Sequence, residues 1–111
     1  MKVKLTDGRT LHMQFMVSHH KRRHVTGCRL ELASDDGSES PIEVGRNAVC
    51  HAGDTYNKVA GKALALDRAM RTLRTFADVR RQDRKQVWGR FYCAMRQSPD
   101  IQAMSGYGEY L

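Results

Sequence analysis

The stretch DTYNKVAGKALALDRAMRTL, residues 54–73, decides the fold, because a start signal, a periodic pattern and helix propensity coincide there. Asp54 follows Gly53 and suits the N-cap position, where its carboxylate can accept a backbone N–H at the positive end of the helix dipole. Apolar side chains recur at steps of four and three residues: Val59, Ala63, Leu66, Met70 and Leu73. The stretch therefore predicts a long amphipathic helix that begins at Asp54.

A second line on this helix carries almost no side chain. Gly61, Ala65 and Ala69 follow one another at four-residue spacing. A glycine costs a helix about 1 kcal/mol relative to alanine, so a packing role is favoured for Gly61. We expect another backbone to lie close along this line.

The first fifty residues have the alternating pattern of strands. Residues 3–5 and 10–17 flank Asp7-Gly8, a dipeptide that tolerates the positive φ angles of a tight turn, so they predict a β-hairpin. In the second of these strands the predicted core face holds Leu11, Met13, Phe15 and Val17.

Two further strands are expected after a polar connection at residues 18–24. Residues 25–33 place four side chains on one face: Thr26, Cys28, Leu30 and Leu32. A turn at residues 34–41 then leads to a fourth strand in two pieces, 42–44 and 47–51, with Gly45 as a β-bulge between them.

A second helix is predicted after a break at residues 76–78, with Asp78 as its cap and Ser98-Pro99 as its stop. Its apolar ridge consists of Val87, Phe91 and Met95, with Trp88 and Tyr92 beside them. Four strands followed by two helices predict an α+β fold, a four-stranded antiparallel meander covered on one face by a C-terminal helical hairpin. We expect one domain over residues 1–97 and a tail over 98–111, either frayed or packed on a neighbouring subunit.

The size and composition of the chain limit its class. With 111 residues there is room for one domain, and a large internal cavity is not expected. No run approaches the roughly 18 apolar residues of a membrane span, and the start of the chain lacks the apolar core of a signal peptide. Three widely spaced cysteines fit reduced thiols. These features predict a soluble, cytoplasmic protein without membrane contact.

The formal charge of +7 is concentrated near the C-terminus. Residues 68–96 contain nine basic and two acidic residues, whereas residues 1–67 contain ten basic and eight acidic ones. This asymmetry indicates an anionic partner, although a solvated arginine-rich surface would have the same composition.

Two groups of basic residues are candidates for binding that partner. On the second helix, four-residue steps place Arg80, Arg84 and Trp88 on one side, with Arg81 and Lys85 beside them. The connection at 18–24 contains Lys21, Arg22 and Arg23 among three histidines. It is either an exposed loop or a phosphate-contacting one. A metal site is disfavoured there because the permanent cations would repel the ion.

No pattern in the sequence indicates catalysis. There is no glycine-rich phosphate loop, no His-Glu-x-x-His and no nucleophile with a recognisable base. Cys50 and His51 are adjacent, which in a strand sends their side chains to opposite faces. We expect a non-enzymatic protein without cofactor or metal.

One longer pattern carries a resemblance. Cys50-His-x-x-Asp54-x-Tyr56-x-Lys58-x-x-Gly61-Lys62-x-x-Ala65-Leu66-x-Arg68-Ala69 follows a strand with Thr26-x-Cys28 and precedes a basic helix. It resembles a signature of small phage-encoded accessory proteins, over residues 12–95. These proteins usually have arginine where this chain has Lys62.

The resemblance implies a non-enzymatic phage inhibitor of bacterial immunity, active in the infected host. It favours an anti-CRISPR protein that occludes a CRISPR effector. The alternatives are a sponge that sequesters a cyclic nucleotide signal, as Thoeris anti-defence proteins do, and a small nucleic-acid-binding module. The partner would be a defence effector, its nucleic acid or an anionic nucleotide, and a homo-oligomer is compatible with each. The resemblance transfers no individual binding residue.

Overall fold

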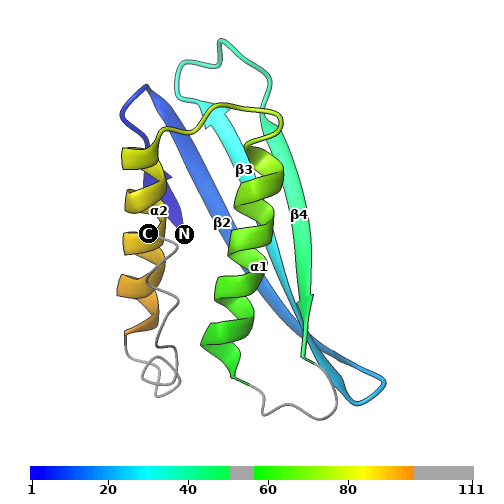
Figure 1. Ribbon diagram of the computed structural model, residues 1–111. Coiled ribbons are helices and arrows are strands. Elements are labelled where there is room, and N and C mark those ends of the chain that lie inside the picture. Colours follow the sequence, from blue (N-terminus) through cyan, green and yellow to red (C-terminus); the bar gives the residue numbers. More distant parts are fainter. Residues whose placement is uncertain (51–56, 97–111) are drawn as a thin grey trace.

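A computed structural model describes residues 1–50 and 57–96 of the chain. Its elements are β1 (Lys2–Lys4), β2 (Arg9–His20), β3 (Arg23–Ser34), β4 (Ile42–Val49), α1 (Lys58–Leu73) and α2 (Arg81–Met95). The strands form one antiparallel sheet in the order β1-β2-β3-β4, and both helices lie against the same face of it (Figure 1). This confirms the predicted α+β class, the meander and its one-sided helical cover.

The first hairpin forms where the sequence predicts it. Gly8 has a φ of 82°, and the Leu5 N–H donates to the Arg9 carbonyl at 2.8 Å. Glycine adopts this φ without the steric penalty of a side chain, so the turn can be tight.

The second hairpin is longer than the sequence suggests. The predicted polar connection at 18–24 is wrong, because β2 and β3 stay paired up to His20 and Arg23. Only Lys21 and Arg22 form the turn, with φ angles of 48° and 64°. Polar side chains hid these strand ends, since a strand beyond the core has no need of alternation.

β4 is continuous, and the predicted bulge at Gly45 is wrong. Gly45 pairs with Arg29, and the neighbouring Arg46 pairs with Cys28 in unbroken register. The predicted end of this strand at His51 lies outside the described residues.

Helix α1 begins later than predicted. Asn57 is its N-cap, and the Ala60 N–H donates to the Asn57 side-chain oxygen at 2.9 Å. Asp54, the predicted cap, lies outside the described residues. Asparagine serves as an N-cap as well as aspartate does, which the prediction of Asp54 did not take into account.

The packing of α1 follows its two predicted lines. Every member of the apolar stripe is buried, and Ala65 and Ala69 are fully buried as well. Gly61 is only half-buried. Helix α1 lies against β3 and β4, as Figure 1 shows.

Helix α2 begins at Arg81, with Arg80 as an N-cap that makes no side-chain cap bond. The prediction that Asp78 caps this helix is therefore wrong. Val87 and Phe91 are fully buried, and the Phe91 ring lies 5.6 Å from that of Phe15 on β2. This contact joins α2 to the predicted core face of the sheet. The predicted stop at Ser98-Pro99 and the tail lie outside the described residues.

The core face ends before the strands do. Leu11 and Met13 are buried and Phe15 is half-buried, but Val17 is 40% exposed. The expectation that Val17 belongs to the core is wrong, because β2 extends past the helices that cover it (Figure 1).

Candidate functional site

The helices and the loop between them present most of the positive charge to solvent. We call their exposed basic residues the basic helical layer: Lys58, Arg68, Arg71, Arg74, Arg80, Arg81, Lys85, Arg90 and Arg96. In the described residues 57–96 there are three acidic side chains, of which Asp83 is buried, Asp67 is half-buried and Asp78 is exposed. The layer is thus strongly positive at its surface.

Two residues of this layer, Arg71 and Arg68, make contacts that hold them in place. Asp67 forms an ion pair with Arg71 one helical turn later, at 3.2 Å. Arg68 donates through Nη1 to the Asn47 carbonyl at 2.9 Å, which links α1 to β4. A carbonyl accepts a hydrogen bond without cancelling the guanidinium charge. Arg68 therefore still contributes to the field of the layer.

On α2 the exposed side differs from the predicted one. Arg81 and Lys85 are exposed and one turn apart, whereas Val87 and Phe91 occupy a different, buried side. This pair is a pre-ordered presentation of two cations, because the helix backbone already fixes their spacing.

Trp88 does not flank a basic patch, which corrects the predicted site. It is 3% exposed, and its ring lies 5.8 Å from that of Phe91 and 5.9 Å from that of Tyr92. A tryptophan buried among these rings cannot stack on a ligand without unpacking the core. Its role is structural.

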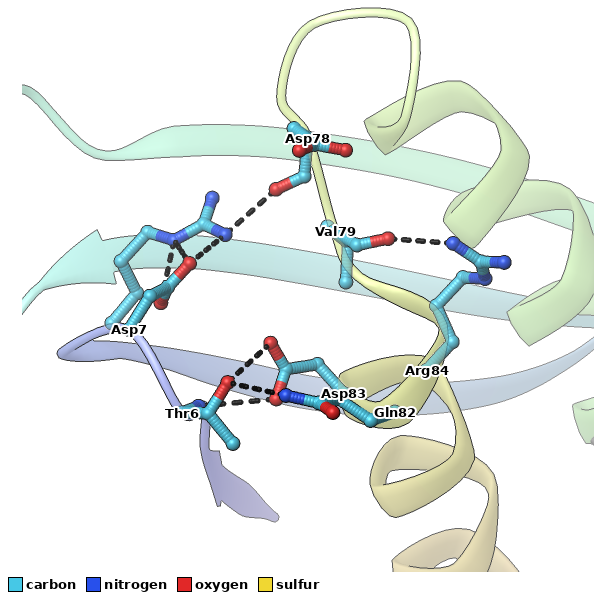
Figure 2. A network of polar contacts seen from close by, with 8 residues as sticks. Thr6, Asp7, Asp78, Val79, Gln82, Asp83 and Arg84 are labelled. Carbon is cyan, nitrogen blue, oxygen red and sulfur yellow. Dashed lines mark hydrogen bonds and ion pairs between the residues drawn. The ribbon is translucent and has the colours of Figure 1, made fainter.

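Two other predicted binding residues, Arg84 and Arg80, are placed less favourably for contact with an anionic partner. Arg84 is half-buried and donates through Nη1 to the Val79 carbonyl at 2.6 Å, which closes the turn before α2 (Figure 2). Arg80 is exposed, but it lines an open hollow whose other charged residues are mostly acidic. The exposed cations of the predicted α2 patch that remain outside this hollow are Arg81 and Lys85.

That hollow has a volume of about 610 Å³ and lies between the β1–β2 turn, the β3–β4 loop and the loop before α2. Its charged lining comprises Asp7, Arg9, Asp35, Asp36, Glu39, Asp78 and Arg80. Five carboxylates against two guanidiniums make it a poor receptor for an anionic nucleotide.

The start of α2 is fixed by a contact that the sequence analysis missed. Asp83 is fully buried and accepts bonds from the Thr6 N–H at 3.0 Å and the Thr6 hydroxyl at 3.2 Å. Gln82 donates to the same hydroxyl at 3.3 Å (Figure 2). An acidic residue in the first helical turn was the one available signal, since that position favours negative charge.

A second contact fixes the loop before α2. Arg9 forms an ion pair with Asp7 and donates to the Asp78 carbonyl at 2.7 Å. The hydrogen bonds from Arg9 lower the pKa of the Asp7 carboxyl below its ordinary value. Both contacts tie the helical layer to the β1–β2 turn.

The other predicted group, Lys21, Arg22 and Arg23, lies at the far end of β2 and β3. All three side chains are exposed. β2 spans twelve residues from Arg9 to His20, or roughly 37 Å between these two at the usual rise of a strand. The structure therefore does not bring the two predicted groups into one site (Figure 1).

Two observations on the described residues concern metal binding and thiol chemistry. Among them no three His, Cys, Asp or Glu side chains are grouped so as to hold a metal ion. Burial raises the pKa of the Cys28 thiol to about 12, which keeps it protonated and unreactive. Neither α1 nor α2 is long and apolar enough to span a bilayer.

Comparisons with known proteins found no match, so the resemblance to small phage proteins stays a prediction. Binding chemistry therefore has to be argued from the charges and contacts of the chain itself. No model of a known protein family, no curated protein and no solved structure matches this chain.

Proposed function

We propose that this protein is a non-enzymatic nucleic-acid-binding protein that contacts phosphates through its basic helical layer. The observation that carries the proposal is the contrast between nine exposed basic residues and one exposed acidic residue over residues 57–96. Each phosphate neutralised by lysine or arginine releases counterions, so such a surface binds nucleic acid without reading its sequence.

The order of the helical layer supports this proposal. Asp83 and Thr6 hold the start of α2, and Arg68 holds α1 to β4. A pre-ordered surface loses less conformational entropy on binding than a flexible segment does. Because Asp83 is buried, its charge also lies beneath the layer and away from the phosphates.

The proposed biological role is inhibition of a host defence effector by a phage protein. It rests on the resemblance of residues 12–95 to small phage accessory proteins. A basic layer could compete for the guide or target nucleic acid of a CRISPR effector, which is the favoured target. The acidic hollow gives little support to the alternative, a sponge for a cyclic nucleotide.

Two measurements separate these roles. Co-purification with effector complexes tests the CRISPR role. A thermal shift screen with cyclic nucleotides tests the sponge. A rise of several degrees with one nucleotide, and no effector bound, would reverse the preference.

Binding to a fluorescein-labelled 20-base-pair DNA duplex tests the proposed activity directly. We expect the affinity to fall steeply between 50 and 200 mM salt, as counterion release requires. Arg81→Gln with Lys85→Gln should weaken binding more than Lys2→Gln with Lys4→Gln, which removes equal charge from exposed positions on β1. No binding by the wild type at 50 mM salt would refute the proposal.

A further inference from the structure

The tip of the β2–β3 hairpin has a backbone that its residues do not favour. Lys21 and Arg22 both have positive φ, as the two central residues of a type I′ turn require. The other positive-φ positions among the described residues are Gly8 and Gly37. Side chains at such positions cost roughly 1 kcal/mol or more each, and Asn-Gly would avoid most of that cost.

The tip also projects from the body of the protein. The last β3–β4 pair is Val25 with Val49, and the Cys50 N–H donates to the His24 carbonyl at 2.9 Å, so residues 19–23 extend beyond the last of these contacts. Figure 1 shows the tip past the end of β4 and the start of α1. The side chains of residues 19–23 are all exposed.

The charge of the hairpin is uniform along most of its length. No acidic residue occurs between Asp7 and Glu31. Three successive cations at 21–23 lie among three histidines, and the rings of His19 and His24 face each other across the strands at 4.8 Å. The tip is thus a narrow positive projection with no carboxylate of its own.

We propose that this hairpin tip is a second nucleic-acid contact, which inserts Lys21 and Arg22 between the phosphates that border the major groove of duplex DNA. The inference rests on the proposed function and adds a separate site to it. A strained turn that presents two cations is explained if those cations bind a ligand. A two-stranded ribbon fits the major groove of B-form DNA, whereas that of an RNA duplex is too narrow.

The two contacts can serve one ligand. The protein is 46 Å long, and the helical layer and the tip lie at different places along that length. A duplex of 20 base pairs is roughly 68 Å long, so it can reach both. Engagement of the tip adds phosphate contacts without a change in the fold.

The test variant is Lys21→Asn with Arg22→Gly, which keeps a two-residue turn, relieves its strain and removes two charges. Binding to the labelled DNA duplex is measured from 50 to 200 mM salt beside Lys2→Gln with Lys4→Gln. We expect the salt slope of the tip variant to be shallower by about 1.8, or 0.9 for each lost phosphate contact. The control variant should keep the slope of the wild type, and the tip variant should melt no lower than the wild type.

Several results would overturn the proposal. One is a tip variant that has a higher melting temperature than the wild type but binds DNA as the control variant does. The strained turn at Lys21 and Arg22 would then not be explained by DNA binding. An equal loss with an RNA duplex would overturn the assignment to the major groove. If the tip variant does not fold, Lys21→Gln with Arg22→Gln removes the same two charges, and it must weaken binding more than Lys2→Gln with Lys4→Gln. Absence of wild-type binding at 50 mM salt would instead overturn the proposed function itself.

Discussion

The carboxylate of Asp83 accepts hydrogen bonds from both the backbone N–H and the hydroxyl of Thr6, although the two residues are 77 positions apart. Thr6 belongs to the turn between β1 and β2, and Asp83 to the first turn of α2. The contact therefore fixes the last element of the described fold to the turn that follows the first (Figure 2).

Replacement of Asp83 should destabilise the protein strongly. Asp83→Ala leaves the Thr6 N–H without its acceptor, and we expect the free energy of unfolding to fall by about 3 kcal/mol. Thr6→Val keeps the backbone bond and removes the two bonds of the hydroxyl, to Asp83 and from Gln82, and should cost about 1 kcal/mol. Urea denaturation of both variants measures these values. Equal losses would show that the backbone bond contributes nothing.

The Asp7–Arg9 pair predicts a small acid dependence of stability. Because Arg9 lowers the pKa of Asp7 in the folded state, the pair stabilises the protein above the ordinary pKa of 3.8. That contribution is lost as the pH falls through the lowered folded value. Asp7→Asn should therefore be less stable than the wild type at pH 6, by under about 1 kcal/mol for a partly exposed pair. Thermal melts from pH 6 to pH 2 should converge, and a constant difference would contradict the assignment.

Much of the fold was predictable from local pattern. Alternation placed Leu11, Met13, Leu30 and Leu32 on one face, and the steps of four and three placed Leu66 and its neighbours in the core. The ends of elements were less predictable. From the sequence, Asp54 alone was considered as the cap of α1, whereas the structure has Asn57 there, a residue of equal capping ability.

The candidate site was predictable in charge but not in orientation. An excess of arginine in residues 68–96 indicated a basic helical surface. Which side of α2 faces solvent depends on tertiary contacts, such as those of Phe91 with Phe15 and Asp83 with Thr6. The four-residue spacing of Val87 and Phe91 did predict the buried ridge. Trp88 was assigned to the basic patch as well, and its burial among the neighbouring rings contradicts that second assignment.

The close packing of α1 predicts a steric limit at Ala65. The Ala65 side chain is a fully buried part of α1, and this helix lies on β3 and β4. Ala65→Leu should lower the free energy of unfolding by about 1–3 kcal/mol through overpacking. Ala94 is exposed on α2, so Ala94→Leu should change stability by less than about 0.5 kcal/mol. Thermal midpoints that differ little between the two variants would show that α1 can shift to make room.

The basic residues of α2 should separate into a structural and a binding class. Arg84 donates to the Val79 carbonyl, whereas Arg81 and Lys85 are exposed on the helix. Arg84→Gln should lower the free energy of unfolding by about 1 kcal/mol, since it breaks a charge-assisted bond. Its effect on DNA binding should match that of Lys2→Gln, because each variant loses one charge that acts only by long-range attraction.

Arg81→Gln should leave the stability unchanged and cause a larger loss of DNA affinity, because it removes a phosphate contact. Melting curves and DNA-binding curves for Arg84→Gln, Arg81→Gln and Lys2→Gln at 100 mM salt test this division. A larger affinity loss for Arg84→Gln than for Arg81→Gln would place the phosphates on the Arg84 side of the helix.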